Sequence, residues 1–166
     1  EPNGVPRELK GSVVTFNYNK FDQLKKIVEE NDIGVIMMEV LHSEEPKDDF
    51  LHKIRDIATK KNIILIFDEI SSGFRQTFGG IHKLFKVEPD MAVFGKALGN
   101  GYPITAVIGK RDIMDEAQST FISSTFWTDR VGPTAALKTL EVMDREKSWE
   151  KITEIGRHVQ KSWKIQ

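Results

Sequence analysis

Short apolar runs alternate with amphipathic segments along this chain, and this alternation restricts the fold more than any other feature of the sequence. Two runs, 34–40 and 63–67, are almost wholly apolar, as expected of strands that are buried on both faces. Three shorter runs also predict strands: 13–18, 91–94 and 105–108. Four segments carry apolar residues at helical spacing and predict helices: 21–30, 46–60, 131–144 and 149–163. In the last of these helices we expect four side chains to face inward: Ile152, Ile155, Val159 and Trp163.

Strands that alternate with helices tend to pair in parallel, because each helix carries the chain back to the starting edge of the sheet. We therefore predict an α/β fold with three layers, in which an open, mostly parallel sheet has helices on both faces. A length of 166 residues is about that of one ordinary domain, and no internal repeat divides it.

The composition excludes several classes of protein and of site. Hydrophobic residues make up 39% of the chain and charged residues 30%, which is typical of a globular protein and argues against disorder. The net charge is -1, so no overall field favours nucleic acid or an anionic membrane, and no run approaches the ~18 apolar residues that span a bilayer. The absence of cysteine excludes disulfides and thiolate sites and is consistent with a reducing compartment. We expect a cytoplasmic protein that binds neither nucleic acid nor a membrane.

Polar residues whose side chains could take part in a reaction follow two of the apolar runs. Asp68 and Glu69 come directly after 63–67, and Lys96 follows 91–94 among small residues, with two glycines soon after it. Ligands of open α/β sheets bind beyond the carboxyl ends of the strands. A partly apolar crevice disfavours the charged form of a lysine, so the Lys96 amine would be available there as a nucleophile.

Each of these residues also has a simpler interpretation. Asp68 alone could cap backbone amides, and Lys96 alone could be a surface lysine in a turn. Three carboxylates, those of Asp68, Glu69 and Asp90, could instead bind a divalent cation, although they are not clustered in the sequence and no phosphate-binding loop accompanies them. The four histidines show no ligand spacing and are expected on the surface or in packing: His42, His52, His82 and His158.

The order and spacing of these motifs together are more specific than any one of them. The matching stretches are LIFDEISSGFR at 65–75, a Gly-Gly pair at 79–80, VEPD at 87–90 and GKALGNGYP at 95–103. This stretch resembles the large domain of class-III aminotransferases, which are pyridoxal-phosphate enzymes of fold type I, and is most similar to the glutamate-1-semialdehyde aminomutase branch.

The resemblance implies pyridoxal 5'-phosphate as the cofactor and assigns roles to five residues. Lys96 would form the Schiff base with the cofactor and carry a proton between carbons. Asp68 would pair with the pyridinium nitrogen, which keeps the ring an electron acceptor. Ile70 stands where the family usually has a valine on the ring face, and Ser71 stands where many members have Gln or Met. Thr128 matches the threonine that contacts the cofactor phosphate, typically from the neighbouring subunit.

The neighbourhood of Thr128 departs from the glycine-rich version that is common in the family, and Thr125 is an alternative for the same role. The resemblance also implies a homodimer with its active sites at the interface, where Phe126 and Trp127 would then lie. Glu39 matches a family glutamate near the site, with a buried acid satisfied by the backbone as the alternative.

The implied reaction is transfer of an amino group from a small-molecule donor to a carbonyl acceptor, or its internal 1,2-shift; both remain open. The alternative is a non-catalytic dimerising or cofactor-binding module. The presence of both Lys96 and Asp68 argues against it. The resemblance covers the downstream half of the large domain. The glycine-serine turn that holds the phosphate, and the small domain that grips the substrate carboxylate, have no counterpart in residues 1–166. We therefore expect residues 1–166 to form one partial cofactor-binding domain that is inactive alone.

Overall fold

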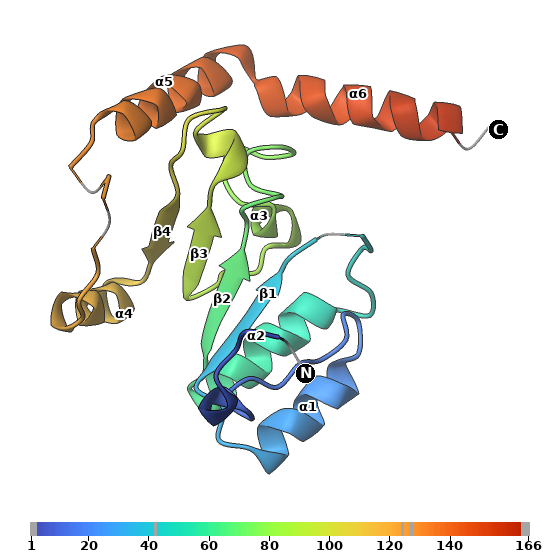
Figure 1. The fold of residues 1–166 in the computed structure, drawn as a ribbon. Helices are drawn as coiled ribbons and strands as arrows, with labels where there is room; N and C mark the ends of the chain where they lie inside the picture. Colours follow the sequence, from blue (N-terminus) through green and yellow to red (C-terminus); the bar gives the residue numbers. More distant parts are fainter. Residues whose placement is uncertain (1–2, 42, 124, 127, 164–166) are drawn as a thin grey trace.

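A computed structural model describes residues 3–41, 43–123, 125–126 and 128–163. Its strands form a single sheet in the order β1-β2-β3-β4 (Figure 1). Their bounds are β1 (Val35–Glu39), β2 (Ile64–Asp68), β3 (Met91–Phe94) and β4 (Ala106–Gly109). The first three strands are parallel, and β4 pairs with β3 in the antiparallel sense. The predicted α/β fold with a mostly parallel sheet is confirmed.

The predicted helices are also present, with small changes at their ends. They are α1 (Phe21–Glu30), α2 (Phe50–Lys61), α5 (Val131–Glu146) and α6 (Ser148–Trp163), with two short helices, α3 (His82–Phe85) and α4 (Arg111–Asp115). Single 3-10 turns lie at η1 (Arg7–Leu9), η2 (Lys96–Leu98) and η3 (Glu116–Ser119). Helix α2 begins later than predicted because Asp48 and Asp49 both adopt left-handed backbone angles, which no helix continues. No described helix is long and apolar enough to cross a membrane.

The prediction of a strand over 13–18 is wrong. This segment forms no ladder of hydrogen bonds with β1 in the described structure, and Val13 is 79% exposed. The segment is instead attached to the end of β1 through the Tyr18 hydroxyl, which donates a hydrogen bond of 2.5 Å to the Val40 carbonyl. A strand needs a neighbour to satisfy its backbone groups, and local β propensity does not provide one.

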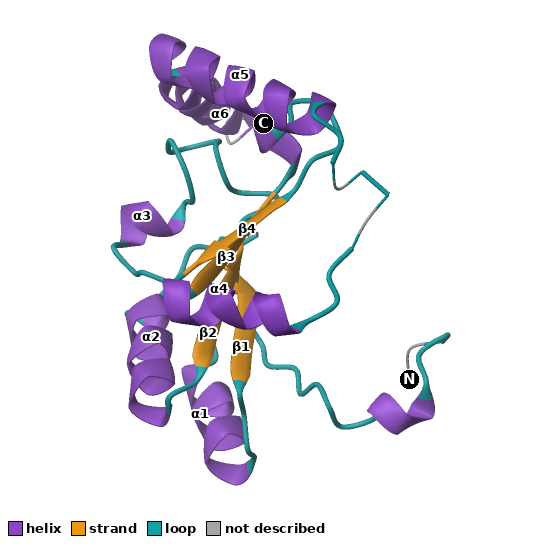
Figure 2. Ribbon diagram, turned by 90° about the vertical axis from the view of Figure 1, so that its left-hand side faces the viewer, coloured by secondary structure: helices purple, strands orange, loops and turns teal. Residues whose placement is uncertain are grey.

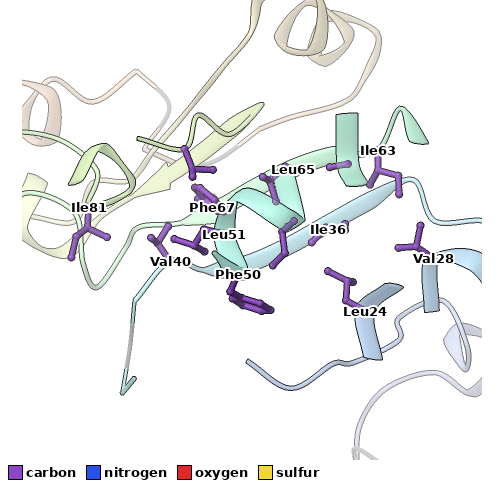
Figure 3. Packing of buried hydrophobic residues seen from close by; sticks show 13 residues of the cluster. Leu24, Val28, Ile36, Val40, Phe50, Leu51, Ile63, Leu65, Phe67 and Ile81 are labelled. Carbon is purple, nitrogen blue, oxygen red and sulfur yellow. The ribbon is translucent and has the colours of Figure 1, made fainter. Parts of the chain in front are cut away.

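The main core lies on one face of the sheet. Ile36, Leu65 and Phe67 point from β1 and β2 toward α1 and α2, where they meet the apolar stripes of both helices (Figure 3). Seen along the edge of the sheet, α1, α2 and α3 lie on the same side of it (Figure 2). On the other face the alternate side chains of β1 are open, with Met37 55% exposed. Helices α1, α2 and α3 thus form one helix layer of the fold.

Helix α6 does not bury the side chains that were expected to face inward. All four of them are exposed: Ile152, Ile155, Val159 and Trp163. The helix leaves the end of α5 and runs away from the sheet (Figure 1). The beginning of α6 meets the rest of the domain, where the Trp149 ring lies 5.4 Å from the Phe78 ring and Ile152 lines a hollow near Lys96. The apolar spacing correctly predicted a helix, but a stripe is buried only where another element covers it.

Candidate active site

Two of the predicted site residues lie at the carboxyl edge of the parallel strands. Asp68 is the last residue of β2, and Lys96 begins the turn η2 just after β3. Because β2 and β3 run parallel, with Asp68 opposite Val93, their ends open toward the same side of the sheet. This is the upper edge of the sheet in Figure 1, and ligands of open α/β sheets bind at such an edge.

The amine of Lys96 is held by a hydroxyl group from the turn after β2. Lys96 Nζ donates a hydrogen bond of 2.6 Å to Ser71 Oγ. The backbone of Lys96 has a φ of 40°, in the left-handed region that residues other than glycine seldom adopt. Such a conformation costs about 1–3 kcal/mol and occurs preferentially at functional sites. The surrounding turn holds it, because the Leu98 N–H donates to the Gly95 carbonyl at 2.9 Å and the Leu98 side chain is buried.

Asp68 has one carboxylate oxygen that is not used by the described residues. Its Oδ1 atom accepts a hydrogen bond of 3.0 Å from the Ile70 N–H, which shapes the turn after β2. The described residues give its Oδ2 atom no hydrogen bond, and the side chain is half-buried. A carboxylate in this position can accept a charged N–H group of a ligand.

The turn that carries Ile70 and Ser71 connects the two strand ends. Ile70 is half-buried, and its Cγ2 atom would lie 3.5 Å from a Cβ atom placed on Gly95. It therefore packs against the backbone that leads into Lys96. The structure thus brings four predicted site residues together: Asp68, Ile70, Ser71 and Lys96.

Lys96 lines a hollow of about 350 Å³ together with Phe74, Arg75, Ala97, Asn100, Gly101, Met143 and Ile152. A second hollow, of about 790 Å³, lies between the loop at 99–102 and α5. Asn100, Met143 and Ile152 line both hollows, so the two are neighbours. Sequence reasoning missed Met143 and Ile152, because they come from α5 and α6, and no motif links those helices to Lys96.

Thr128 is not brought to the same place. It is exposed, precedes α5 and lines neither of the two hollows near Lys96. Thr125 is exposed as well, and Phe126 is 70% exposed. Trp127 lies outside the described residues.

Glu39 reaches the carboxyl edge of the sheet, as the last residue of β1 and opposite Asp68 in register. It is half-buried and lines a separate hollow of about 560 Å³ beside the segment 13–16. Strand β2 separates it from β3 and Lys96, and neighbouring strands are about 4.8 Å apart.

Glu69 is the first residue after β2 and is fully buried. It accepts hydrogen bonds from Ser72 Oγ at 2.5 Å and from the His82 backbone N–H at 3.0 Å, and its Oε1 atom lies 2.8 Å from His82 Nδ1. Burial raises the pKa of Glu69, but the hydrogen bonds from His82 and Ser72 outweigh it and hold the pKa below its usual range. His82 itself is buried, whereas His52 and His158 are exposed and His42 lies outside the described residues.

Asp90 lies at the other end of the sheet, just before β3. Its carboxylate is bonded to Arg55 Nη1 at 2.8 Å, Lys110 Nζ at 2.6 Å and the Leu65 N–H at 2.8 Å. Burial raises the pKa of Asp90, but hydrogen bonds from the Leu65 N–H, Lys110 and Arg55 outweigh it and lower the pKa. The three carboxylates of the metal-site alternative are thus not brought together: Glu69 and Asp90 have protein partners, and the described residues contain no cluster of three metal-ligating side chains.

Comparison with known proteins agrees with this geometry. Residues 7–164 match the family described as aminotransferase class-III. The chain is 40% identical over 163 residues to the 3-aminobutyryl-CoA aminotransferase of Cloacimonas acidaminovorans, covering 93% of this chain and 39% of that protein. It is 38% identical to the glutamate-1-semialdehyde 2,1-aminomutase of Sulfolobus acidocaldarius, covering 87% of this chain and 36% of that protein. The chain therefore spans about two fifths of the length of these curated relatives.

Solved structures agree as well. The ornithine aminotransferase from Toxoplasma gondii, which was crystallised with partial occupancy of PLP at its active site, superimposes with a TM-score of 0.78 at 26% identity, over 86% of this chain and 35% of that chain. An omega-transaminase from Sphaerobacter thermophilus gives a TM-score of 0.77 at 27% identity, over 86% of this chain and 35% of that chain. With the family match over nearly the whole chain, these likenesses lead to one conclusion: the chain belongs to the class-III aminotransferase family.

Proposed function

We propose that the protein transfers an amino group between a small-molecule amino donor and a carbonyl acceptor, with pyridoxal 5'-phosphate as its cofactor. The single observation that carries this proposal is the placement of the Lys96 amine, 2.6 Å from Ser71 Oγ, at the same strand edge as Asp68. Membership in the class-III family supports it.

The residues at this edge suit the cofactor. A primary amine is needed to attach its aldehyde carbon, and Lys96 offers one at the wall of a hollow. A carboxylate is needed beside its ring nitrogen, and Asp68 has an oxygen without a partner among the described residues. When bound, the cofactor supplies a protonated pyridine ring that accepts the electron pair left on the substrate carbon.

Each of the four residues at this edge then has a definite role. Asp68 holds the proton on the ring nitrogen, because an ionised carboxylate favours the charged form of its partner. Lys96 accepts a proton from one carbon of the substrate and returns it to another, as a positioned general base and acid. Ser71 orients the lysine amine, and Ile70 would offer an apolar surface to the ring.

We propose that Thr128 contacts the cofactor phosphate from a second copy of the chain, so that the active protein is a cytoplasmic homodimer. Thr128 is exposed and apart from the hollow that Lys96 lines, which is consistent with service to a neighbouring site. Phe126, exposed two residues before it, would then be covered at the interface. Sedimentation of the Phe126→Ala variant tests this, because an unchanged dimer would count against the interface.

The two neighbouring hollows near Lys96 favour a substrate that is longer than a simple amino acid. The larger hollow lies along α5, has a volume of about 790 Å³ and is lined in part by Val131, Val142 and Ile152. One relative is named for an aminobutyryl-CoA substrate and another for an aminomutase reaction. We propose an amino compound with an extended acyl part as the first substrate class to assay, with the 1,2-shift of an amino aldehyde as the second.

Covalent trapping tests the proposal directly. Pyridoxal 5'-phosphate is added to the purified chain, an absorbance spectrum is recorded, the sample is reduced with borohydride, and the modified peptide is identified by mass spectrometry. We expect an adduct on Lys96 that is lost in Lys96→Ala but kept in the matched variant Lys60→Ala, which removes an exposed lysine of α2. Trapping spread over many lysines, with no preference for Lys96, would reject the assignment.

A further inference from the structure

A buried acid–histidine pair packs against the turn after β2, whose Ser71 hydroxyl binds the Lys96 amine. None of the roles proposed above uses this pair. Glu69 is 0% exposed and His82 is 8% exposed. Within this pair, Glu69 Oε1 lies 2.8 Å from His82 Nδ1 and accepts the His82 backbone N–H at 3.0 Å. The two residues are 13 positions apart and join the end of β2 to the start of α3.

The same carboxylate also fixes the turn between them. Ser72 Oγ donates to Glu69 Oε2 at 2.5 Å, and the Gly73 N–H donates to the Glu69 carbonyl at 2.8 Å. Ser71 lies inside this turn, and its own carbonyl accepts a hydrogen bond of 3.0 Å from Arg75 Nε. The backbone of Ser71 is thereby tied on both sides before its hydroxyl meets Lys96.

The chain makes room for the pair with glycine. A Cβ atom on Gly80 would lie 2.4 Å from the His82 ring and 2.7 Å from Glu69 Oε1. A Cβ atom on Gly73 would lie 2.7 Å from both the Glu69 carbonyl oxygen and the Phe94 ring. Contacts this short do not occur in folded proteins, so the backbone closes on the pair only because these two positions lack side chains.

We propose that Glu69 and His82 are positioning residues, which set the turn 69–73 so that the Ser71 hydroxyl meets the Lys96 amine. The physical reason is that a buried carboxylate with several donors has one favourable place, and each lost donor leaves part of its charge unsatisfied. The identity of Lys96 as the cofactor lysine rests on the proposed function, whereas the positioning itself can be measured without cofactor.

The test measures the reactivity of single lysines. Each protein is treated briefly with trinitrobenzenesulfonate, and the rate of modification at Lys96 is determined by mass spectrometry relative to two exposed lysines of α2, Lys60 and Lys61. Ser71→Ala removes the hydrogen bond to the amine and should raise the relative rate at Lys96 by about threefold to tenfold, the change expected for one net hydrogen bond. His82→Leu should raise it to a similar extent, and His82→Asn, which keeps a donor near the Nδ1 position, should leave it within about twofold.

Two outcomes would decide against the proposal. If His82→Leu lowers the melting temperature but leaves the relative rate at Lys96 unchanged, the pair has only a structural role. If His82→Leu does not fold, Ser72→Ala removes one donor to Glu69 from a half-buried position, and an unchanged rate at Lys96 in that variant rejects the proposal equally. A failure to trap pyridoxal phosphate on wild-type Lys96 would reject the proposed function and leave the labelling result intact.

Discussion

Lys96 Nζ and Ser71 Oγ lie 2.6 Å apart, although 25 positions separate the two residues in the chain. The contact joins the turn after β2 to the turn after β3, and it directs a flexible amine toward the edge where Asp68 ends its strand. A lysine side chain loses conformational entropy about several rotatable bonds when it is held in this way. A cofactor that binds this amine therefore meets a group that is already ordered.

Ser71→Ala should weaken the equilibrium binding of pyridoxal phosphate by about threefold to tenfold, because the freed amine must then be ordered when the cofactor binds, even though it reacts faster with a small reagent. The free energy of unfolding should change by less than ~0.5 kcal/mol, since the residue is only half-buried. Titration of the absorbance band with cofactor, beside thermal melting, measures both quantities. Equal capture by Ser71→Ala and wild type would mean that the hydroxyl does not order the amine.

Asp68→Asn and Asp68→Ala should separate the two uses of this carboxylate. Asparagine can still accept the Ile70 N–H, so the fold should keep its stability, but it no longer holds a charged ring nitrogen and should weaken cofactor binding by tenfold or more. Alanine loses both and should also lower the free energy of unfolding by about 1 kcal/mol. Urea unfolding and cofactor titration of both variants provide the measurement; full binding by Asp68→Asn would remove Asp68 from the site.

Asp90 should make stability fall in acid. Its pKa is lowered in the folded protein because hydrogen bonds from the Leu65 N–H, Lys110 and Arg55 outweigh its burial. A carboxyl of this kind stabilises the fold above its unfolded pKa of about 3.9, and that stabilisation is lost as the pH falls through the lower folded value. Asp90→Asn should therefore cost about 2–4 kcal/mol at pH 7 and less below pH 4.

Urea unfolding of wild type and Asp90→Asn at pH 7, 5 and 3 checks this expectation, with Asp112→Asn on the surface of α4 as the control. The difference between wild type and Asp90→Asn should shrink as the pH falls. A difference that stays constant over the whole range would show that the carboxylate charge does not matter to the fold.

Gly80→Ala should lower the free energy of unfolding, and Gly156→Ala should raise it. The new methyl group at Gly80 would meet the His82 ring and the Glu69 carboxylate, so we expect a loss of about 1–3 kcal/mol. Gly156 lies within α6, and nothing approaches its Cβ position within 4 Å. Alanine there should add about 0.5–1 kcal/mol because it restricts the unfolded chain and favours helix. Melting of the two variants beside wild type decides between these signs.

The regular elements with the strongest patterns were predictable. Helix α1 has its predicted bounds, and the Asn31 side chain and backbone both donate to the Ile27 carbonyl to end it. Strands β1 and β2 follow from runs that no amphipathic helix would contain. The strand predicted over 13–18 and the inward face of α6 failed for a common reason, because the local pattern was right for an element but no neighbour covered or paired with it.

The sequence by itself determined which residues could carry chemistry, since Asp68 and Lys96 stand at the ends of apolar runs within a motif of high specificity. The tertiary structure alone decided how they are held. It brought Ser71 to Lys96, His82 to Glu69, and Arg55 with Lys110 to Asp90. Partners 13 to 35 positions apart meet through the pairing of strands and the turns between them. Spacing along the chain does not encode such meetings, because they depend on where each side chain points after the sheet has formed.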